Sequence, residues 1–193
     1  MSELGATLGL LAGGLAAKMI YDSNFSDVEY VTSKVDGRKY LVRKLDDNKE
    51  AANLLANMRI KLIKLCDHLE QNNTENKDVY RLIKRFQPNN ITESSASEKY
   101  TSYSVNKGEK IVFCLRSRDE QQKLVNENVM MFVALHELAH IMTKSVGHTE
   151  EFWNNFRYLL KKAIEIGVYK SVDFESKPVD YCGIKITSSP LKN

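Results

Sequence analysis

The feature that most constrains this chain is a pair of histidines four residues apart within a run of apolar residues. His136 and His140 enclose Glu137, and nearly every other residue from Val129 to Met142 is apolar. Residues four apart lie on one face of an α-helix, and a helix that is apolar on all sides is buried. Because an unpaired buried polar group costs about 1–3 kcal/mol, two buried imidazoles need partners. A single metal ion bound by both would satisfy them.

The spacing also predicts the chemistry. Two histidines with a glutamate after the first form the H-E-x-x-H arrangement of zinc-dependent peptidases, in which the glutamate is the general base. A catalytic zinc takes three protein ligands and keeps a fourth position for water. His148 is the favoured third ligand, because Gly147 allows a sharp turn that folds it back over the helix. A carboxylate further along the chain, Glu151 or Glu165, is the alternative.

The residues after the motif resemble those of a known family. HELAH is followed by a short loop and then by Gly-His-Thr-x-x-Phe-Trp, which ends at Trp153. This pattern is similar to that of the WLM and SprT-like metallopeptidases. The resemblance implies that zinc is the cofactor, that its ligands are His136, His140 and His148, and that Glu137 is the catalytic base. The third histidine departs from the family pattern, since it lies eight residues after the second, two more than those families usually have.

A second resemblance concerns the whole domain. The stretch from about Asp27 to Ile186 looks similar to uncharacterised WLM-like proteins of large DNA viruses of algae. The two resemblances imply an α+β fold of the minimal zincin-like metallopeptidase type, with a small antiparallel sheet packed on the buried H-E-x-x-H helix. The chain then divides into residues 1–23, expected to form an N-terminal apolar helix, and residues 24–193, expected to form the metallopeptidase domain.

The expected reaction is hydrolysis of a polypeptide substrate. Zinc lowers the pKa of its bound water to about 7 and polarises the scissile carbonyl, while Glu137 takes the water proton and delivers it to the leaving amine. A tyrosine from the C-terminal tail is a candidate for stabilising the oxyanion, and the two candidates are Tyr181 and Tyr169. Each is also consistent with an ordinary packed aromatic residue.

A sheet edge beside the active helix would pair with extended substrate through main-chain hydrogen bonds. Residues 100–105 are the expected edge, with Tyr100, Ser102 and Ser104 as candidate contacts, and they form a hairpin with residues 110–116. Alternation, helical periodicity and turn or cap residues predict the other elements. These are a hairpin over 28–43, helices over 48–71, 78–86 and 150–166, and a short strand over 184–186.

Residues 4–21 differ from the rest of the chain because they are mostly apolar and Lys18 is their one charged residue. As a helix they would extend roughly 27 Å, nearly the thickness of a bilayer core. Gly5, Gly9 and Gly13 form a small-residue ladder typical of packed membrane helices. A membrane anchor is the favoured interpretation, with packing on an apolar protein partner and a cleaved signal as alternatives. The basic residues that follow predict a membrane-anchored protein whose catalytic domain faces the cytosol.

The cysteines and the net charge limit the environment and the partners. Cys66, Cys114 and Cys182 are scattered and form no C-x-x-C pair, which predicts reduced thiols in a reducing compartment. The formal net charge is +3, with both signs interspersed, and this gives no support to a nucleic-acid partner. A DNA–protein crosslink protease, a role found among WLM and SprT relatives, is therefore less favoured.

A function of another class is also consistent with the sequence. In this alternative the protein is a structural or assembly component of a virion membrane or capsid, and zinc serves mainly to staple the fold. Glu137 argues for chemistry instead, since a structural zinc site needs no general base. A fourth protein ligand would decide for the structural alternative.

Overall fold

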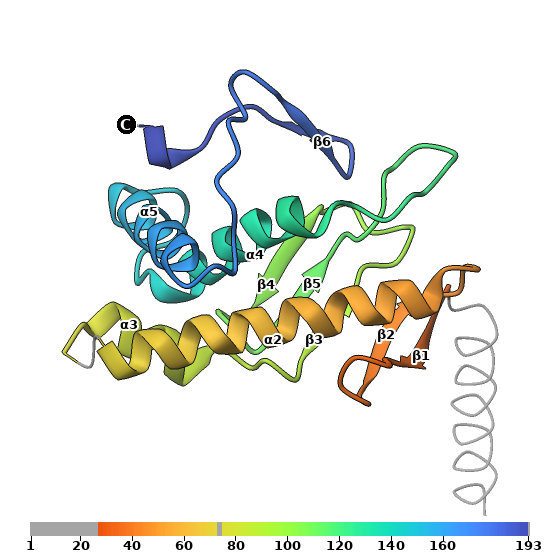
Figure 1. Ribbon diagram of the computed structural model, residues 1–193, viewed down its shortest axis with the longest axis horizontal. Helices are drawn as coiled ribbons and strands as arrows, with labels where there is room; N and C mark the ends of the chain where they lie inside the picture. Colours follow the sequence, from red (N-terminus) through yellow and green to blue (C-terminus); the bar gives the residue numbers. More distant parts are fainter. Residues whose placement is uncertain (1–26, 73–74, 193) are drawn as a thin grey trace, which may run out of the picture.

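The computed structural model describes residues 27–72 and 75–192 (Figure 1). The helices in these ranges are α2 (Asn48–Asn72), α3 (Lys77–Arg85), α4 (Glu127–Met142), α5 (Glu150–Glu165) and the 3-10 helix η1 (Pro190–Lys192). The strands are β1 (Val28–Thr32), β2 (Lys39–Arg43), β3 (Ile91–Glu93), β4 (Ser102–Val105), β5 (Lys110–Phe113), β6 (Val179–Tyr181) and β7 (Ile184–Ile186). This mixture of helices and small sheets confirms the predicted α+β class.

The main sheet has three strands in the order β3-β5-β4. β4 and β5 form the predicted antiparallel hairpin, but β3 runs parallel to β5, so the expectation of a purely antiparallel sheet is wrong. β3 escapes prediction because its three residues are too few to show alternation and lie among turn-forming residues. The Glu93 carboxylate anchors β3, since it accepts hydrogen bonds from the Arg43 backbone N–H at 2.7 Å and from Arg116 Nε at 2.8 Å.

The remaining elements agree closely with the sequence-based expectations. β1 and β2 pair antiparallel as the first predicted hairpin, and α2, α3 and α5 begin and end within one residue of their predicted bounds. β7 coincides with the predicted short strand, and it pairs antiparallel with β6. β6 lies in a tail that the sequence predicts to be irregular apart from one strand, so the C-terminal hairpin is not predicted from the sequence.

α4 occupies the centre of the molecule, and in Figure 1 it runs between α2 and the C-terminal β6–β7 hairpin. It contacts α5, α3, β4 and α2. Residues on all of its faces are buried, as its sequence predicts, and Met130, Leu135 and Ile141 are 0% exposed. The side chain of Asn126 caps its N-terminus by accepting hydrogen bonds from two first-turn amides. The helix that carries the H-E-x-x-H motif is therefore fixed by packing around its whole circumference.

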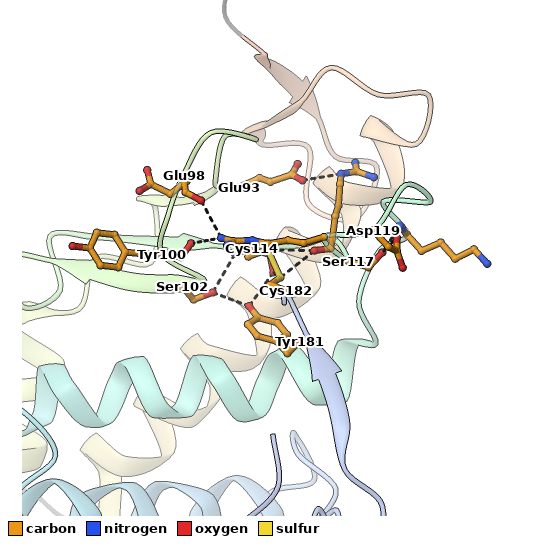
Figure 2. Close-up of a disulfide and its surroundings, with 12 residues drawn as sticks. Glu93, Glu98, Tyr100, Ser102, Cys114, Ser117, Asp119, Tyr181 and Cys182 are labelled. Atoms are coloured by element: carbon orange, nitrogen blue, oxygen red, sulfur yellow. Dashed lines mark hydrogen bonds and ion pairs between the residues drawn. A yellow bond between two sulfur atoms is a disulfide. The ribbon is translucent and has the colours of Figure 1, made fainter. Parts of the chain in front are cut away.

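A disulfide joins Cys114, directly after β5, to Cys182 in the β6–β7 turn (Figure 2). The prediction that all three cysteines are reduced is therefore wrong, while Cys66 is free and buried. The pairing cannot be read from spacing, because the two cysteines are 68 residues apart and meet when the C-terminal hairpin folds back onto the sheet. Tyr181 packs beside the bridge and donates a hydrogen bond to the Cys114 carbonyl at 2.9 Å.

The predicted membrane-anchored localisation is contradicted. Across residues 27–72 and 75–192, no helix is both long and apolar enough to cross a membrane. α4 is the most apolar helix of this part of the chain, but its 16 residues fall short of the roughly 20 that a bilayer core requires. Residues 1–23, where the apolar helix and the domain boundary are expected, lie outside the described ranges.

Candidate metal centre

Three histidine side chains converge beside α4. His136 and His140 come from successive turns of the helix, and His148 comes from the loop that follows it. The Nε2 atom of His136 lies 3.2 Å from that of His140 and 3.1 Å from that of His148. The ligand atoms of all three lie within 4.8 Å of one another. The structure thus brings together the three residues that the sequence analysis assigns to the metal.

This geometry suits a tetrahedral metal ion. Zinc–nitrogen distances of 2.0–2.1 Å place two tetrahedral ligands about 3.3 Å apart, close to the observed spacings of 3.1 and 3.2 Å. Burial, together with the neighbouring imidazoles, lowers the pKa of His136 to about 3 and that of His140 to about 4. Both are therefore neutral near pH 7, which is the form that binds metals. The residues present fit zinc.

The carboxylates considered as alternative ligands are engaged elsewhere. Glu151, in the first turn of α5, accepts hydrogen bonds from the backbone amides of Lys144 at 3.0 Å and Ser145 at 3.2 Å. These bonds hold the pKa of its carboxyl below the usual value. Glu165, in the last turn of α5, pairs with Lys162 at 2.8 Å. Among the described residues, the cluster contains His148 and neither carboxylate.

The aromatic pair of the sequence pattern packs against the histidines. The ring centroid of Phe152 lies 4.9 Å from that of His136, 4.4 Å from that of His140 and 4.7 Å from that of His148, and Phe152 is fully buried. Trp153 packs on His148 at 5.6 Å and is 41% exposed. One buried ring therefore restrains the orientation of all three imidazoles, and the second shields the outer one.

Glu137 is buried beside the cluster. It is 5% exposed, and it lines a cavity of about 410 Å³ together with the three histidines. Burial raises the pKa of its carboxyl to about 8, and a hydrogen bond from the Ser104 backbone N–H acts in the opposite direction. That bond ties the carboxyl to β4. A carboxyl at the edge of an open cavity, oriented by a backbone hydrogen bond, is placed to exchange a proton with a molecule bound beside the histidines, and burial makes its ionised form a stronger base than an exposed carboxylate.

β4 is the edge strand that the sequence analysis proposes for substrate binding. It lies at the end of the sheet, and within residues 27–72 and 75–192 β5 is its one pairing partner. The Cys114 amide donates to the Thr101 carbonyl at 2.9 Å, so by antiparallel alternation the main-chain groups of Ser102 and Ser104 point away from β5. Both serines line the cavity beside the histidines. Tyr100 does not line it; it is 68% exposed, and its carbonyl accepts a hydrogen bond from Arg118.

The two tyrosines considered for the oxyanion are packed elsewhere. The Tyr181 side chain is fully buried, and its hydroxyl lies 2.7 Å from the Ser102 hydroxyl and donates to the Cys114 carbonyl (Figure 2). Tyr169 is 2% exposed and packs on Phe132, with 6.2 Å between ring centroids. Neither tyrosine lines the cavity beside the histidines. Both are packed aromatic residues, which is the other interpretation that the sequence allows. The sequence around each tyrosine does not indicate the direction in which its hydroxyl points.

Two features of the site are absent from the sequence-based expectations. A second cavity, of about 740 Å³, shares His136 with the first. Its walls include the apolar side chains of Phe132, Trp153 and Phe156, and residues 188–190 of the tail also contribute. The tail reaches this cavity because the helix η1 packs against α5. No local motif in the sequence indicates that packing.

Lys107 is the second such feature. It lines the first cavity, and its ammonium group donates hydrogen bonds to the loop that follows α4. Asn106 and Lys107 both have left-handed backbone, with φ of 46° and 54°, which costs roughly 1–2 kcal/mol for a residue with a Cβ atom. The sequence Asn-Lys-Gly indicates a turn and nothing more. Strained backbone beside a candidate site is a reason to look for a function.

The fold and the site together define a class of protein. The chain is an α+β domain in which an H-E-x-x-H helix supplies two histidines, the next loop supplies a third, and a glutamate lies buried beside them. Residues 69–189 match the WLM domain, which is more than half of the chain, and the protein belongs to the WLM family. Family and fold indicate a metallopeptidase-type function.

Individual relatives agree with this assignment. The chain is 36% identical over 173 residues to Uncharacterized protein R325 of Acanthamoeba polyphaga mimivirus, covering 86% of each chain. It is 32% identical over 97 residues to Uncharacterized protein 136R of Invertebrate iridescent virus 6, covering 49% of this chain and 52% of that one. A solved mutant of Wss1 from Saccharomyces cerevisiae aligns with a TM-score of 0.50 and 22% identity over 66% of this chain and 88% of that one. The predicted resemblance to proteins of large DNA viruses is confirmed, and the Wss1 likeness supports the fold.

Proposed function

We propose that the protein is a zinc-dependent peptidase that hydrolyses polypeptides with Glu137 as general base. The observation that carries the proposal is the placement of a buried glutamate and three converging imidazoles around one open cavity. A purely structural zinc site needs four protein ligands and no base. Among the described residues the cluster has three ligands, which leaves a coordination position for water or substrate.

The residues of the chain have distinct roles in this reaction. His136, His140 and His148 would hold the zinc ion, which supplies a Lewis acid and lowers the pKa of a bound water to about 7. Glu137 would accept the proton of the attacking water and return it to the leaving amine. The hydrogen bond from the Ser104 N–H holds the Glu137 carboxyl in a single orientation, which such a transfer requires.

The surroundings of the site suit an extended chain rather than a small molecule. β4 presents the main-chain groups of Ser102 and the carbonyl of Ser104 on an edge that pairs with no further strand among the described residues, and an extended peptide can add to such an edge as a further strand. His136 borders both the 410 Å³ and the 740 Å³ cavity, so a peptide lying across the histidines would reach both. The part of the larger cavity that Phe132, Trp153 and Phe156 line would then receive one of its side chains.

Replacing Glu137 by Gln tests the proposal. The amide is similar in shape but cannot accept the proton, so hydrolysis of fluorescein-labelled casein by the zinc-loaded protein is expected to fall by about 10²–10⁴-fold. Zinc content, measured by elemental mass spectrometry, is expected to stay at one ion per chain. Full activity in this variant would refute the assigned base. No hydrolysis by the zinc-loaded parent of casein or of a mixed peptide library would favour the structural alternative.

A further inference from the structure

Lys107 forms an unusual contact with the loop between the second and third histidine. Its Nζ atom donates to the carbonyls of three consecutive residues, Thr143 at 2.8 Å, Lys144 at 3.2 Å and Ser145 at 2.8 Å. These carbonyls directly follow the end of α4 at Met142. One side chain from a distant turn therefore binds the backbone of most of the segment that connects α4 to His148.

The turn that carries Lys107 is itself fixed by packing. Gly108, which has a φ of 114°, lies so close to the end of α3 that a Cβ atom there would be 2.7 Å from the Arg85 carbonyl oxygen and 3.0 Å from Ile141. The Gly108 carbonyl accepts a hydrogen bond from the Gln87 amide at 3.0 Å. The turn is therefore wedged between α3 and α4, and the Lys107 ammonium starts from an anchored backbone.

The loop is held from a second direction by an opposite charge. Glu151 accepts hydrogen bonds from the amides of Lys144 and Ser145 and from the Ser145 hydroxyl at 2.7 Å. A cation thus binds the carbonyls of this segment while an anion binds its amides. Bonds to charged groups are roughly twice as strong as neutral ones, and carbonyls at a helix C-terminus attract positive charge.

We propose that Lys107 is a positioning residue for the metal site: by binding the three carbonyls it holds the loop after α4 in the conformation that directs His148 at the other two histidines. This accounts for the eight-residue spacing between His140 and His148, because the longer connection is clamped instead of left free. The inference rests on the proposed zinc site, but it concerns the order of the loop before metal binds and does not depend on peptide hydrolysis.

Simple capping of the helix end is the competing explanation. A lysine that merely satisfies the last carbonyls of α4 would contribute to fold stability, and its loss would leave zinc affinity unchanged once the protein is folded. A positioning residue behaves differently. Without Lys107 the loop is disordered before metal binds, so part of the zinc-binding free energy is used to order it. A loss of 10- to 100-fold in zinc affinity is therefore expected, as for other groups that orient ligands.

The variant Lys107→Gly separates the two explanations. Glycine adopts positive φ without strain, so the turn keeps its conformation while the ammonium group is removed. Lys144→Met is the matched control, because it also removes one lysine charge, from an exposed side chain of the loop that Lys107 binds. Zinc dissociation constants would be measured by competition with a chromophoric chelator. Hydrogen exchange of the Lys144 and Ser145 amides would be followed in the zinc-free proteins.

The proposal predicts that Lys107→Gly binds zinc 10- to 100-fold more weakly and exchanges both amides faster, while cooperative urea unfolding shows that the variant is folded. Lys144→Met should bind zinc within twofold of the parent. Unchanged affinity or exchange in folded Lys107→Gly would overturn the positioning role, and an equal loss in Lys144→Met would attribute the effect to net charge. No zinc binding by the parent would instead remove the proposed function, and the exchange measurement would still decide whether Lys107 orders the loop.

Discussion

Breaking the bridge between Cys114 and Cys182 is expected to lower the free energy of unfolding by about 4 kcal/mol. The bridge closes a loop of 68 residues, and the chain-entropy relation for cross-links gives about 4 kcal/mol at 25 °C for a loop of that length. Native packing around it is dense, since Tyr181 and Cys182 are 0% and 2% exposed. The native state therefore keeps the two sulfurs together without the bond. The loss of stability arises mainly because the unfolded chain gains conformational entropy when the cross-link is absent.

Urea unfolding followed by tryptophan fluorescence measures this difference. The chain has a single tryptophan, Trp153, which lies on α5 and reports on the core. With a denaturant slope of about 2 kcal/mol/M, the double substitution Cys114→Ser/Cys182→Ser is expected to lower the midpoint by about 2 M. The reduced parent should behave like the variant, and the variant should not respond to reductant.

The control for this experiment is Cys66→Ala. Cys66 is the free cysteine on α2, so its variant should keep the full response to reductant. A midpoint shift below about 0.5 M on reduction of the parent would refute the reasoning. It would mean that the C-terminal hairpin stays docked in the unfolded ensemble or contributes nothing to cooperative unfolding.

Three further outcomes follow from the site. His148→Ala is expected to abolish stoichiometric zinc binding measured by elemental mass spectrometry, and retained binding would move the third ligand elsewhere. His136 and His140 have folded pKa values of about 3 and 4, below the unfolded value of about 6.5. The unfolded chain therefore takes up protons first, and the urea midpoint of the zinc-free protein should fall as the pH drops from about 6.5 towards 3; a flat profile would contradict the burial. Ser104→Pro removes the N–H that binds Glu137 and should lower kcat with zinc retained, whereas Ser104→Ala keeps it and should match the parent.

The convergence of the three candidate metal ligands could be predicted from the sequence to different extents, for clear reasons. His136 and His140 follow from helical register, because a spacing of four residues places two side chains on one face wherever the helix lies. His148 depended on turn chemistry and on the resemblance to a family, because the direction of a loop is not a periodic property. The run of apolar residues around the motif predicts a buried helix, and the structure confirms the burial of α4, Glu137 included.

Contacts between residues that are distant in the sequence could not be predicted from local patterns. The strand β3 is too short to carry a pattern, and it exists because a parallel pairing with β5 buries Ile91 and engages Glu93. The disulfide needs a chain reversal 68 residues away from its first cysteine. Tyr181 looked like a candidate for the oxyanion because tyrosines can donate to one, but its hydroxyl is committed to Ser102 and Cys114. In each case the outcome depends on a residue that is distant in the sequence and close in the folded structure, so the local sequence pattern does not predict it.

The β4–β5 hairpin explains why the site needs more than the motif helix. Residues 102–107 contact two parts of the site and the tail beside it: Ser104 binds the Glu137 carboxyl, Lys107 binds the loop before His148, and Ser102 contacts Tyr181 of the cross-linked tail. α4 by itself fixes two ligands. The proposed base, third ligand and substrate edge would all take their positions from this one hairpin, whose turn is wedged between α3 and α4. A shift of the hairpin would therefore disturb proton transfer, metal binding and substrate pairing together, which makes it the element whose rigidity matters most for the proposed reaction.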